Sequence, residues 1–452
     1  MFINVYKMSF SIYKPYVKFT TYPGGGGTTN VTNIDISAQI DISATINTDI
    51  CQYDATYWQN VNKTIGKVML ADSMNQDAFG RLRVSNPSTL FDGKMIDSSQ
   101  QLIFDVSFAN GGRITYLSNE SAMRLDVSQA NSFVKRQSHY FAPYQPGKSL
   151  AALGSFYFGS VIPVGAYRRI GFFDDSEGIF FQQDSNGLSW NIRSISAPST
   201  SVTQSNWNID KLNGTGPSGY TLSMGNTNLM FIDIEWLGVG RIRTGFYLNG
   251  VLVYCHQFSQ TLTSVYIKSP YKPVRYEVGT TSAQTFDVSM KQICCTILSE
   301  GGYEPLGLLC SHLNETSIDL ATNVYTPVMS IRLRPEYGKG LLKPLFYDII
   351  GSGGTTYYYQ ILRNPVLTSP TWFNVNNYSQ VDVTSSSLTG GVIIGTGFVL
   401  GSQRFTISDL LSSVLVFQSD INGTPDIFTI AVKASSAQNK NVGTSITWQE
   451  IV

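Results

Sequence analysis

The sequence predicts an all-β protein built from more than one domain. Short runs of β-branched and aromatic residues recur between turn residues through most of the 452 positions. Forty Gly residues can supply the turns, and 25 Tyr and 25 Phe favour strands. The length exceeds the roughly 150 residues of one typical domain, so two or three domains are expected.

The charge composition excludes several classes of partner. Charged residues make up 14% of the chain, well below the roughly 25% that is usual in soluble domains. Lys plus Arg and Asp plus Glu number 31 each, and no basic block occurs, so neither nucleic acid nor an anionic membrane surface is expected as a partner. Low charge beside abundant Gly and aromatic residues is typical of a β-protein in a large, stable assembly.

Metal, cofactor and membrane motifs are also missing from the sequence. Its five Cys include no C-x-x-C pair and its three His no H-x-x-x-H spacing, so buried thiols are expected and no metal site is predicted. Neither a Walker nor a dinucleotide glycine pattern is present, and we expect no cofactor. Lys7 interrupts the apolar start, which argues against a signal peptide, and the apolar stretch 392–400 is much shorter than a membrane span of about 20 residues.

Residues 1–56 are predicted to form an extended N-terminal arm. Four glycines at 24–27 indicate a flexible hinge, and a repeat of Asn/Gln-Ile-Asp-Ile-Ser-Ala follows at 33–38 and 39–44. Isoleucines that alternate with polar residues have the period of a strand, and one such strand cannot bury its own apolar face. We therefore predict that this stripe mediates homo-oligomerisation, most simply as a trimer; the alternative is an edge strand of a larger sheet. The stripe comprises Ile34, Ile36, Ile40, Ile42 and Ile46.

The rest of the chain divides into a connector and two β domains. The connector spans residues 57–90, a large antiparallel sandwich is expected over 91–300, and a second, smaller β-sandwich over 301–452. Asn249-Gly250 is a strong hairpin signal between two apolar runs, because both residues accept a positive φ. The segment around it, 246–254, resembles the hairpin of concanavalin-A-like and laminin-G-like jelly rolls, and this resemblance implies a jelly-roll fold for residues 91–300.

A second resemblance involves carboxylates. Residues 231–238, Phe-Ile-Asp-Ile-Glu-Trp-Leu-Gly, are similar to the active-site strand of family-sixteen glycoside hydrolases. On that resemblance Asp233 matches the middle carboxylate and Glu235 the acid/base, but Phe231 stands at the nucleophile position and cannot attack an anomeric carbon. No catalytic residue is therefore assigned. Asp233, Glu235 and Trp236 are retained as a possible glycan-binding set, although pairing of the two carboxylates with Arg241 and Arg243 on the adjacent strand is the simpler expectation.

A second acidic group lies in the hairpin 173–187. Asp174, Asp175, Glu177 and Asp184 offer oxygen ligands of the kind that calcium prefers, but their spacing is not that of an EF-hand. We expect a solvated turn at this position.

Four segments together resemble a family of virion structural proteins of tailed phages, marine ones in particular, and of some large DNA viruses. These segments are residues 77–85, 178–184, 207–219 and 236–243. The resemblance implies location in the virion and a non-enzymatic, capsid-associated, fibre, spike or cementing role, with capsid or tail proteins as partners. The alternatives are a tail adhesin that binds a receptor or glycan and, less favoured, a divergent family-sixteen-like glycosidase.

Overall fold

The computed structural model describes residues 17–23, 29–36, 86–259, 264–304, 306–320, 323–352, 354–400, 404–407, 416–435 and 441–452. The chain divides into two compact units, Met1–Asn86 and Pro87–Val452. Almost every regular element described is an antiparallel strand, which confirms the all-β prediction. The exceptions are three short 3-10 helices, Ser118–Glu120, Gln204–Asn206 and Pro335–Tyr337. No helix among these residues is long and apolar enough to cross a membrane.

The first unit contains one described hairpin. Strand β1 (Val17–Pro23) pairs with β2 (Thr29–Ile36), with Phe19 opposite Ile34 and Val17 opposite Ile36. The strand predicted at the start of the isoleucine repeat is thus present and pairs within the chain. Ile40, Ile42 and Ile46, and the motif at 77–85, lie outside the described residues.

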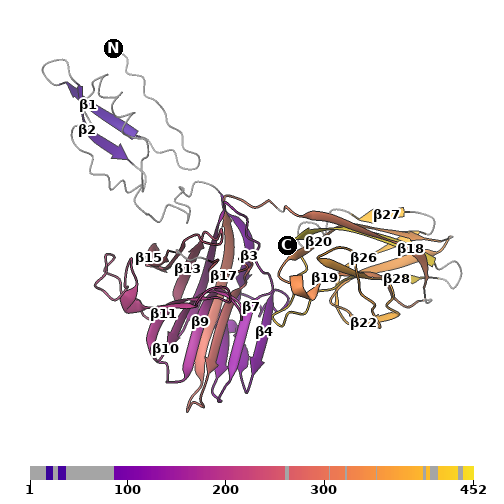
Figure 1. Cartoon of the computed structure of the whole chain (residues 1–452), viewed down its shortest axis with the longest axis horizontal. Helices are drawn as coiled ribbons and strands as arrows, with labels where there is room; N and C mark the ends of the chain where they lie inside the picture. Colours follow the sequence, from indigo (N-terminus) through magenta and orange to yellow (C-terminus); the bar gives the residue numbers. More distant parts are fainter. Residues whose placement is uncertain are drawn as a thin grey trace. The chain divides into compact units, whose positions relative to one another are not determined.

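The second unit begins with a sandwich of two antiparallel sheets, here called the first sandwich, whose layers are visible in Figure 1. The seven-stranded sheet has the order β12 (Thr200–Thr203), β11 (Gly187–Arg193), β10 (Gly178–Asp184), β9 (Ala166–Phe173), β16 (Val274–Thr280), β7 (Phe133–Ser138) and β4 (Phe104–Ala109). The eight-stranded sheet has the order β15 (Val251–Phe258), β14 (Ile242–Leu248), β13 (Asn228–Ile234), β8 (Ser149–Tyr157), β17 (Val288–Glu300), β6 (Ala122–Val127) and β5 (Arg113–Leu117), with β3 (Ser88–Lys94) also paired to β17.

Aromatic side chains fill the space between these two sheets. The ring of Phe181 lies 5.2 Å from that of Trp190 and 5.0 Å from that of Phe246, measured between centroids. Trp190 is fully buried and its Nε1 donates to the sulfur of Cys255, so its one polar group is satisfied in the core. Cys255 is one of the buried thiols expected from the sequence, and burial raises its pKa to about 12.

The predicted hairpin at Asn249-Gly250 is confirmed. Leu248 pairs with Val251, and the two residues between them have φ values of 51° and 81°. Positive φ at both central positions is the requirement of a type I′ turn, whose twist matches that of the flanking strands.

The remaining strands form a second, smaller sandwich, also as predicted. Its four-stranded sheet has the order β18 (Leu308–Asp319), β29 (Asn441–Ile451), β20 (Leu341–Gly351) and β27 (Arg404–Ile407). Its six-stranded sheet has the order β23 (Phe373–Asn374), β24 (Ser379–Asp382), β19 (Thr326–Leu333), β28 (Phe428–Ala434), β21 (Thr356–Arg363) and β26 (Val392–Leu400), and β22 (Val366–Thr368) pairs separately with β25 (Ser387–Thr389). Trp448, Phe428 and Tyr347 are buried at its centre.

Both sandwiches share one topological feature. In the first, β16 lies between β9 and β7, and β17 lies between β8 and β6. In the second, β28 lies between β19 and β21, and β29 between β18 and β20. In each sandwich, therefore, the last two strands of the chain segment occupy interior positions, one in each sheet.

A hydrogen-bonded carboxylate joins the two sandwiches at a site here called the junction. Asp426 of the second sandwich accepts from His139 Nε2 at 2.6 Å, while His139 Nδ1 lies 2.9 Å from Asp105 of the first. Arg363 also donates to Asp426, at 2.9 Å. Burial alone would lower the pKa of His139, but its hydrogen bonds to the two carboxylates outweigh burial and raise the pKa to about 9. The imidazole is therefore a cation held between carboxylates at neutral pH.

Two further contacts reinforce the junction. Gln418 accepts from the backbone N–H of Phe141 and donates to the carbonyl of the same residue, both at 3.0 Å. Asp174 of the first sandwich accepts from Lys272 at 2.9 Å and from Lys339 of the second sandwich at 2.6 Å. The junction thus combines backbone hydrogen bonds with ion pairs.

The acidic hairpin 173–187 differs from the sequence expectation. Asp174 and Glu177 are only 5% and 2% exposed, so the prediction of a solvated turn is wrong for these two residues. Glu177 accepts from the backbone N–H groups of Lys268 and Ser269, and Lys272 Nζ lies 3.4 Å from its carboxylate. Their cationic partners, Lys272 and Lys339, lie more than 90 residues farther along the chain, so local sequence does not reveal them.

The junction predicts a specific pH dependence of stability. Because the pKa of His139 is raised on folding, its contribution is fully present below about pH 6.5, its ordinary value, and is lost as the pH rises through about 9. We expect His139→Gln to lower the free energy of unfolding by on the order of 2–3 kcal/mol at pH 6 and by much less at pH 10. Denaturant titrations of both chains at the two pH values measure the difference.

His312→Gln is the matched control. The pKa of His312 is lowered by partial burial, the opposite direction from the pKa of His139. The destabilisation caused by His312→Gln should therefore not be larger at pH 6 than at pH 10. A His139→Gln effect of equal size at pH 6 and pH 10 would contradict the proposed charge state.

Candidate functional site

The predicted carboxylate strand is β13, an interior strand of the eight-stranded sheet between β8 and β14. Met230, Ile232 and Ile234 belong to the core between the two sheets. Because side chains alternate along a strand, Phe231 and Asp233 lie on the opposite, outer face of this sheet. Phe231 and Asp233, which match the nucleophile and the middle carboxylate of a glycosidase-like site, are therefore on one face, as the sequence pattern predicts.

Asp233 is fully buried on that face, and three side chains among the described residues bind its carboxylate. Arg243, directly opposite on β14, donates at 2.6 Å; Ser149 Oγ donates at 2.7 Å, and the hydroxyl of Tyr254 at 3.1 Å. Arg243 is itself 1% exposed and stacks over the Tyr254 ring at 4.5 Å. The cross-strand pairing expected for Asp233 is present, and it encloses the carboxylate.

The nucleophile position is filled by a buried ring. Phe231 is 2% exposed and forms a small apolar cluster with Ala151, Leu252 and Tyr254. Its ring meets that of Tyr254 edge-on at 5.9 Å. An apolar cluster therefore occupies the position where a retaining glycosidase would need its second carboxylate.

Glu235 and Trp236 lie beyond the end of the strand. β13 ends at Ile234, and the N–H of Glu235 donates to the carbonyl of Arg241 at 3.1 Å. Trp236 Nε1 donates to the carbonyl of Ile267 at 2.9 Å, and its half-buried ring packs against the core between the sheets. The structure thus places Asp233 on the outer face and the Trp236 ring against the core, so the three predicted glycan-binding residues do not line one open surface.

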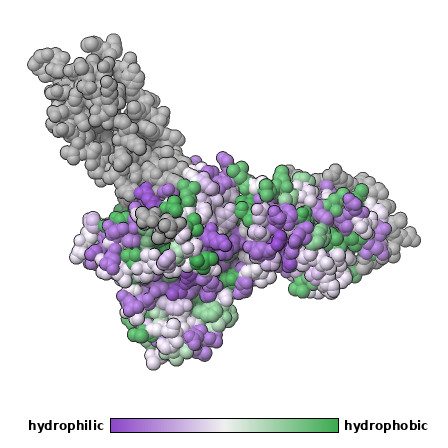
Figure 2. Space-filling model, in the orientation of Figure 1, coloured by the Kyte–Doolittle hydropathy of each residue, from purple (hydrophilic) through white to green (hydrophobic). Residues whose placement is uncertain are grey.

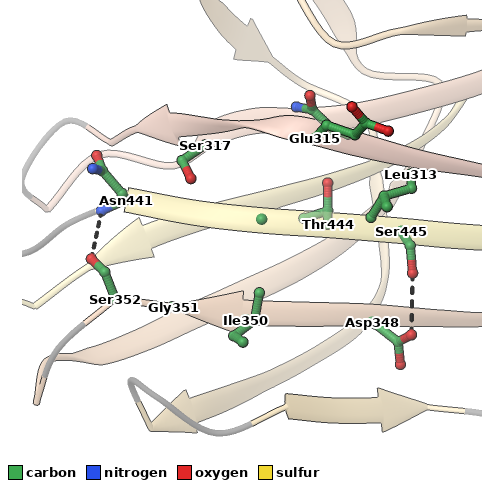
Figure 3. A pocket seen from close by; sticks show the side chains of 12 residues that line it. Leu313, Glu315, Ser317, Asp348, Ile350, Gly351, Ser352, Asn441, Thr444 and Ser445 are labelled. Carbon is green, nitrogen blue, oxygen red and sulfur yellow. Dashed lines mark hydrogen bonds between the residues drawn. The ribbon is translucent and has the colours of Figure 1, made fainter.

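A trough that no sequence pattern predicts lies on the four-stranded sheet of the second sandwich. This trough has a volume of about 590 Å³ and is lined by residues of three adjacent strands and their ends. Figure 3 shows β29 along its floor, with Leu313 and Glu315 on one side and Asp348 and Ile350 on the other. The full lining set is Leu313, Asn314, Glu315, Ser317, Asp348, Ile350, Gly351, Ser352, Asn441, Gly443, Thr444 and Ser445.

The trough coincides with an irregularity in the strand pairing. Asn314 pairs with Thr444, but the next pair joins Ile318 to Val442, so residues 315–317 lie opposite the single residue Gly443. The extra residues of a bulge are left unpaired and bend their strand. Gly443 has no side chain to fill the space in front of the bulge, and the floor there is backbone.

Some polar groups of the trough form hydrogen bonds with one another. Ser445 Oγ donates to Asp348 at 3.1 Å, and Ser352 Oγ accepts from the N–H of Asn441 at 3.2 Å, as the dashed lines of Figure 3 indicate. Thr444 is 2% exposed and pairs with Ile349 of the core, so its side chain lies on the inner face of the sheet and not in the trough.

The charged side chains in the described lining of the trough are the carboxylates of Glu315 and Asp348. Within the part of the chain that the structure describes, no group of three or more His, Cys, Asp or Glu is placed to hold a metal ion. The trough therefore offers hydroxyl, amide and carboxylate groups between two aliphatic side chains, Leu313 and Ile350.

Comparisons with known proteins describe the fold. No protein-family model and no curated protein sequence matches the chain. Among solved structures, it is similar to a Shewanella oneidensis MR-1 protein of unknown function (8% identity, 56% of this chain, 98% of that one, TM-score 0.34) and to peanut lectin with a 9-residue peptide (12%, 48%, 98%, 0.30). The CBM2 module of an evolved Dit from Lactobacillus casei BL23 phage J-1 is also similar (9%, 48%, 98%, 0.33). The two antiparallel sheets of the first sandwich agree with the antiparallel β-sandwich that the sequence predicts for residues 91–300.

The enclosed Asp233 predicts a large effect of removing its cation. Arg243→Met would leave a buried carboxylate without its charge partner, which costs about 3–5 kcal/mol. The double variant Asp233→Asn/Arg243→Met removes both charges and should be more stable than Arg243→Met alone. Chemical denaturation followed by intrinsic fluorescence measures the three chains.

Arg113→Met is the control for this series. Arg113 pairs with Asp287 on the surface, where both side chains are about half exposed, and its loss should cost no more than about 1 kcal/mol. If Arg243→Met lowered the free energy of unfolding by no more than Arg113→Met does, the proposed buried ion pair between Arg243 and Asp233 would be contradicted.

Proposed function

We propose that this protein is a non-enzymatic structural component of a virus particle, of the capsid-associated, fibre, spike or cementing kind. The proposal rests on the resemblance of residues 178–184, 207–219 and 236–243 to virion structural proteins. The single observation that carries its non-enzymatic part is the buried Phe231 beside an Asp233 already bound by Arg243, because a retaining hydrolase needs two free carboxylates there.

The surface composition supports a role within an assembly. Several large apolar side chains of the second sandwich are well exposed, among them Leu309 at 70% and Phe398 at 68%. On the face in Figure 2, apolar residues are interspersed with polar ones over the described residues. Low charge and exposed apolar side chains favour contacts with other proteins, and we propose capsid or tail proteins and further copies of this chain as the partners.

A receptor- or glycan-binding role on the particle is the second candidate. The observation that favours it is the trough of the second sandwich, whose described lining combines hydroxyl, amide and carboxylate groups. In this reading the first sandwich is a scaffold and the ligand site lies elsewhere in the chain.

The absence of catalysis is tested directly. We expect purified full-length protein to show no turnover of β-glucans, agarose or carrageenan, because Phe231 stands at the position of the nucleophile. Glu235→Gln should give the same result as the unchanged chain in a reducing-sugar assay. Turnover that disappears in Glu235→Gln would contradict the proposal and favour the glycosidase alternative.

Assembly through the arm is the second expectation. Five isoleucines that each stabilise by about 1.5–3 kcal/mol when buried would favour association of identical arms. We expect the full-length chain to be a homo-oligomer, with a trimer favoured, and a chain that lacks residues 1–56 to be monomeric. Light scattering measures both molecular masses.

A triple substitution tests the same prediction in the full-length chain, and a single substitution in the same segment is its control. Ile40→Ser/Ile42→Ser/Ile46→Ser should lower the oligomer mass, whereas Thr45→Ser in the same segment should not. A full-length chain that is monomeric at all concentrations would show that the isoleucine repeat pairs only within its own chain.

A further inference from the structure

We propose that Lys272 and Asp174 condense to an intramolecular amide bond, with Glu177 as the proton acceptor. The three residues belong to the first sandwich: Asp174 and Glu177 lie in the turn between β9 and β10, and Lys272 lies just before β16. One condensation within the chain is not turnover of a substrate, so this inference is compatible with the structural function proposed above and does not depend on it. It rests on the distances between the reacting groups, on their burial and on the donors around the Asp174 carboxyl group.

The amine of Lys272 lies close enough to attack Asp174. Its Nζ is 2.9 Å from Oδ2 of Asp174, so nucleophile and carboxyl group are already in contact. Lys272 is fully buried, and its side chain lines a small cavity whose other lining residues include Phe172, Ile234 and Trp236. Burial lowers the pKa of Lys272 from its ordinary value, which favours the neutral, nucleophilic amine.

A second buried carboxylate lies beside the amine. Oε2 of Glu177 is 3.4 Å from Nζ of Lys272. The backbone N–H groups of Lys268 and Ser269 donate to the two oxygens of Glu177, at 2.7 and 3.2 Å, and hold the carboxylate in place. Glu177 is therefore positioned to accept a proton from Nζ while the amine attacks.

Hydrogen-bond donors contact both oxygens of the Asp174 carboxyl group. The backbone N–H groups of Ser176 and Glu177 donate to Oδ1 at 2.8 and 2.9 Å, so they can stabilise the negative charge that develops on this atom during attack. Nζ of Lys339, from the second sandwich, donates to Oδ2 at 2.6 Å. Lys272 and Lys339 outweigh burial and lower the pKa of Asp174, so Oδ2 must gain protons before it leaves, and Lys339 is a donor in contact with it.

The atoms balance without a cofactor or co-reactant. Lys272 starts as an ammonium group and Asp174 as a carboxylate; the Nζ–Cγ bond forms, the Cγ–Oδ2 bond breaks, and Oδ2 leaves as water. Nζ keeps one proton, passes one directly to Oδ2 and gives one to Glu177, while Lys339 supplies the second proton of the water. The Lys339 side chain is 42% exposed, so exchange with solvent can return it and Glu177 to their starting states. Nothing is oxidised or reduced.

Mass spectrometry of the purified full-length chain tests the proposal. We expect its intact mass to be lower than the sequence mass by one water molecule. After digestion with trypsin, residues 170–193 and 269–275 should be recovered as one cross-linked peptide. Lys272→Arg keeps a cation beside Asp174 but cannot form this bond, and Glu177→Gln removes the proton acceptor; both variants should retain the full sequence mass.

Lys135→Arg is the matched control. Lys135 Nζ lies 2.6 Å from Asp175 in the same hairpin, but the Asp175 side chain is 55% exposed, so proximity is present there without burial. This variant should still yield the cross-linked peptide. If Glu177→Gln does not fold by circular dichroism, Lys339→Gln replaces it: the cross-linked fraction, followed over time after cell-free synthesis, should rise at least about ten-fold more slowly because Oδ2 loses a proton donor.

Three results would overturn the proposal. The first is a full-length chain that keeps its full sequence mass after prolonged incubation. The second is a loss of water at another position, including a bond from Asp174 to Lys339 instead of Lys272. The third is a cross-linked peptide that forms as fast and as completely in folded Glu177→Gln, or in Lys339→Gln where that variant replaces it, as in the unchanged chain.

Discussion

The carboxylate of Asp426 is the contact on which the joining of the two sandwiches depends. A single buried side chain receives hydrogen bonds from His139 of one sandwich and from Arg363 and Asn364 of the other. A carboxylate buried to this degree is stable only while its partners remain, because the cost of removing a charge from water must be offset by nearby cations and donors. Its pKa is about 2, since His139 and Arg363 together outweigh the effect of burial. The buried charges that stabilise the junction would lose partners if the two sandwiches separated, so separation is energetically costly.

Buried carboxylates serve a structural purpose elsewhere in the first sandwich as well. Asp233 and Asp174 are both enclosed by cationic side chains. The second sandwich also contains an enclosed carboxylate away from the junction: Asp382 is 1% exposed and accepts hydrogen bonds from Thr384 and Ser385.

Local sequence was sufficient for the elements whose determinants are adjacent in the chain. The turn at Asn249-Gly250 needs two residues that accept a positive φ, and the pairing of Asp233 with Arg243 follows from two strands joined through a short connection. The partners of Asp426 and Asp174 were not predictable in this way: His139 is 287 positions from Asp426, and Lys272 is 98 from Asp174. The trough was missed for a related reason. The trough depends on the register of β18 on β29, in which residues 315–317 lie opposite the single residue Gly443. No sequence pattern within 314–318 predicts this register.

The interior position of the last two strands in each sandwich constrains the order in which the protein folds during synthesis. The first sandwich can close both sheets once β17 has left the ribosome, since all of its strands precede residue 301. The second cannot, because β18 and β20 remain without their shared neighbour until residues 441–451 have been made. During that interval β18 has no partner strand among those described and β20 is paired only with β27, and unpaired strand edges are the condition in which nascent β-proteins aggregate. A finished first sandwich that already presents His139 and Asp174 gives the nascent second sandwich a fixed surface on which to assemble.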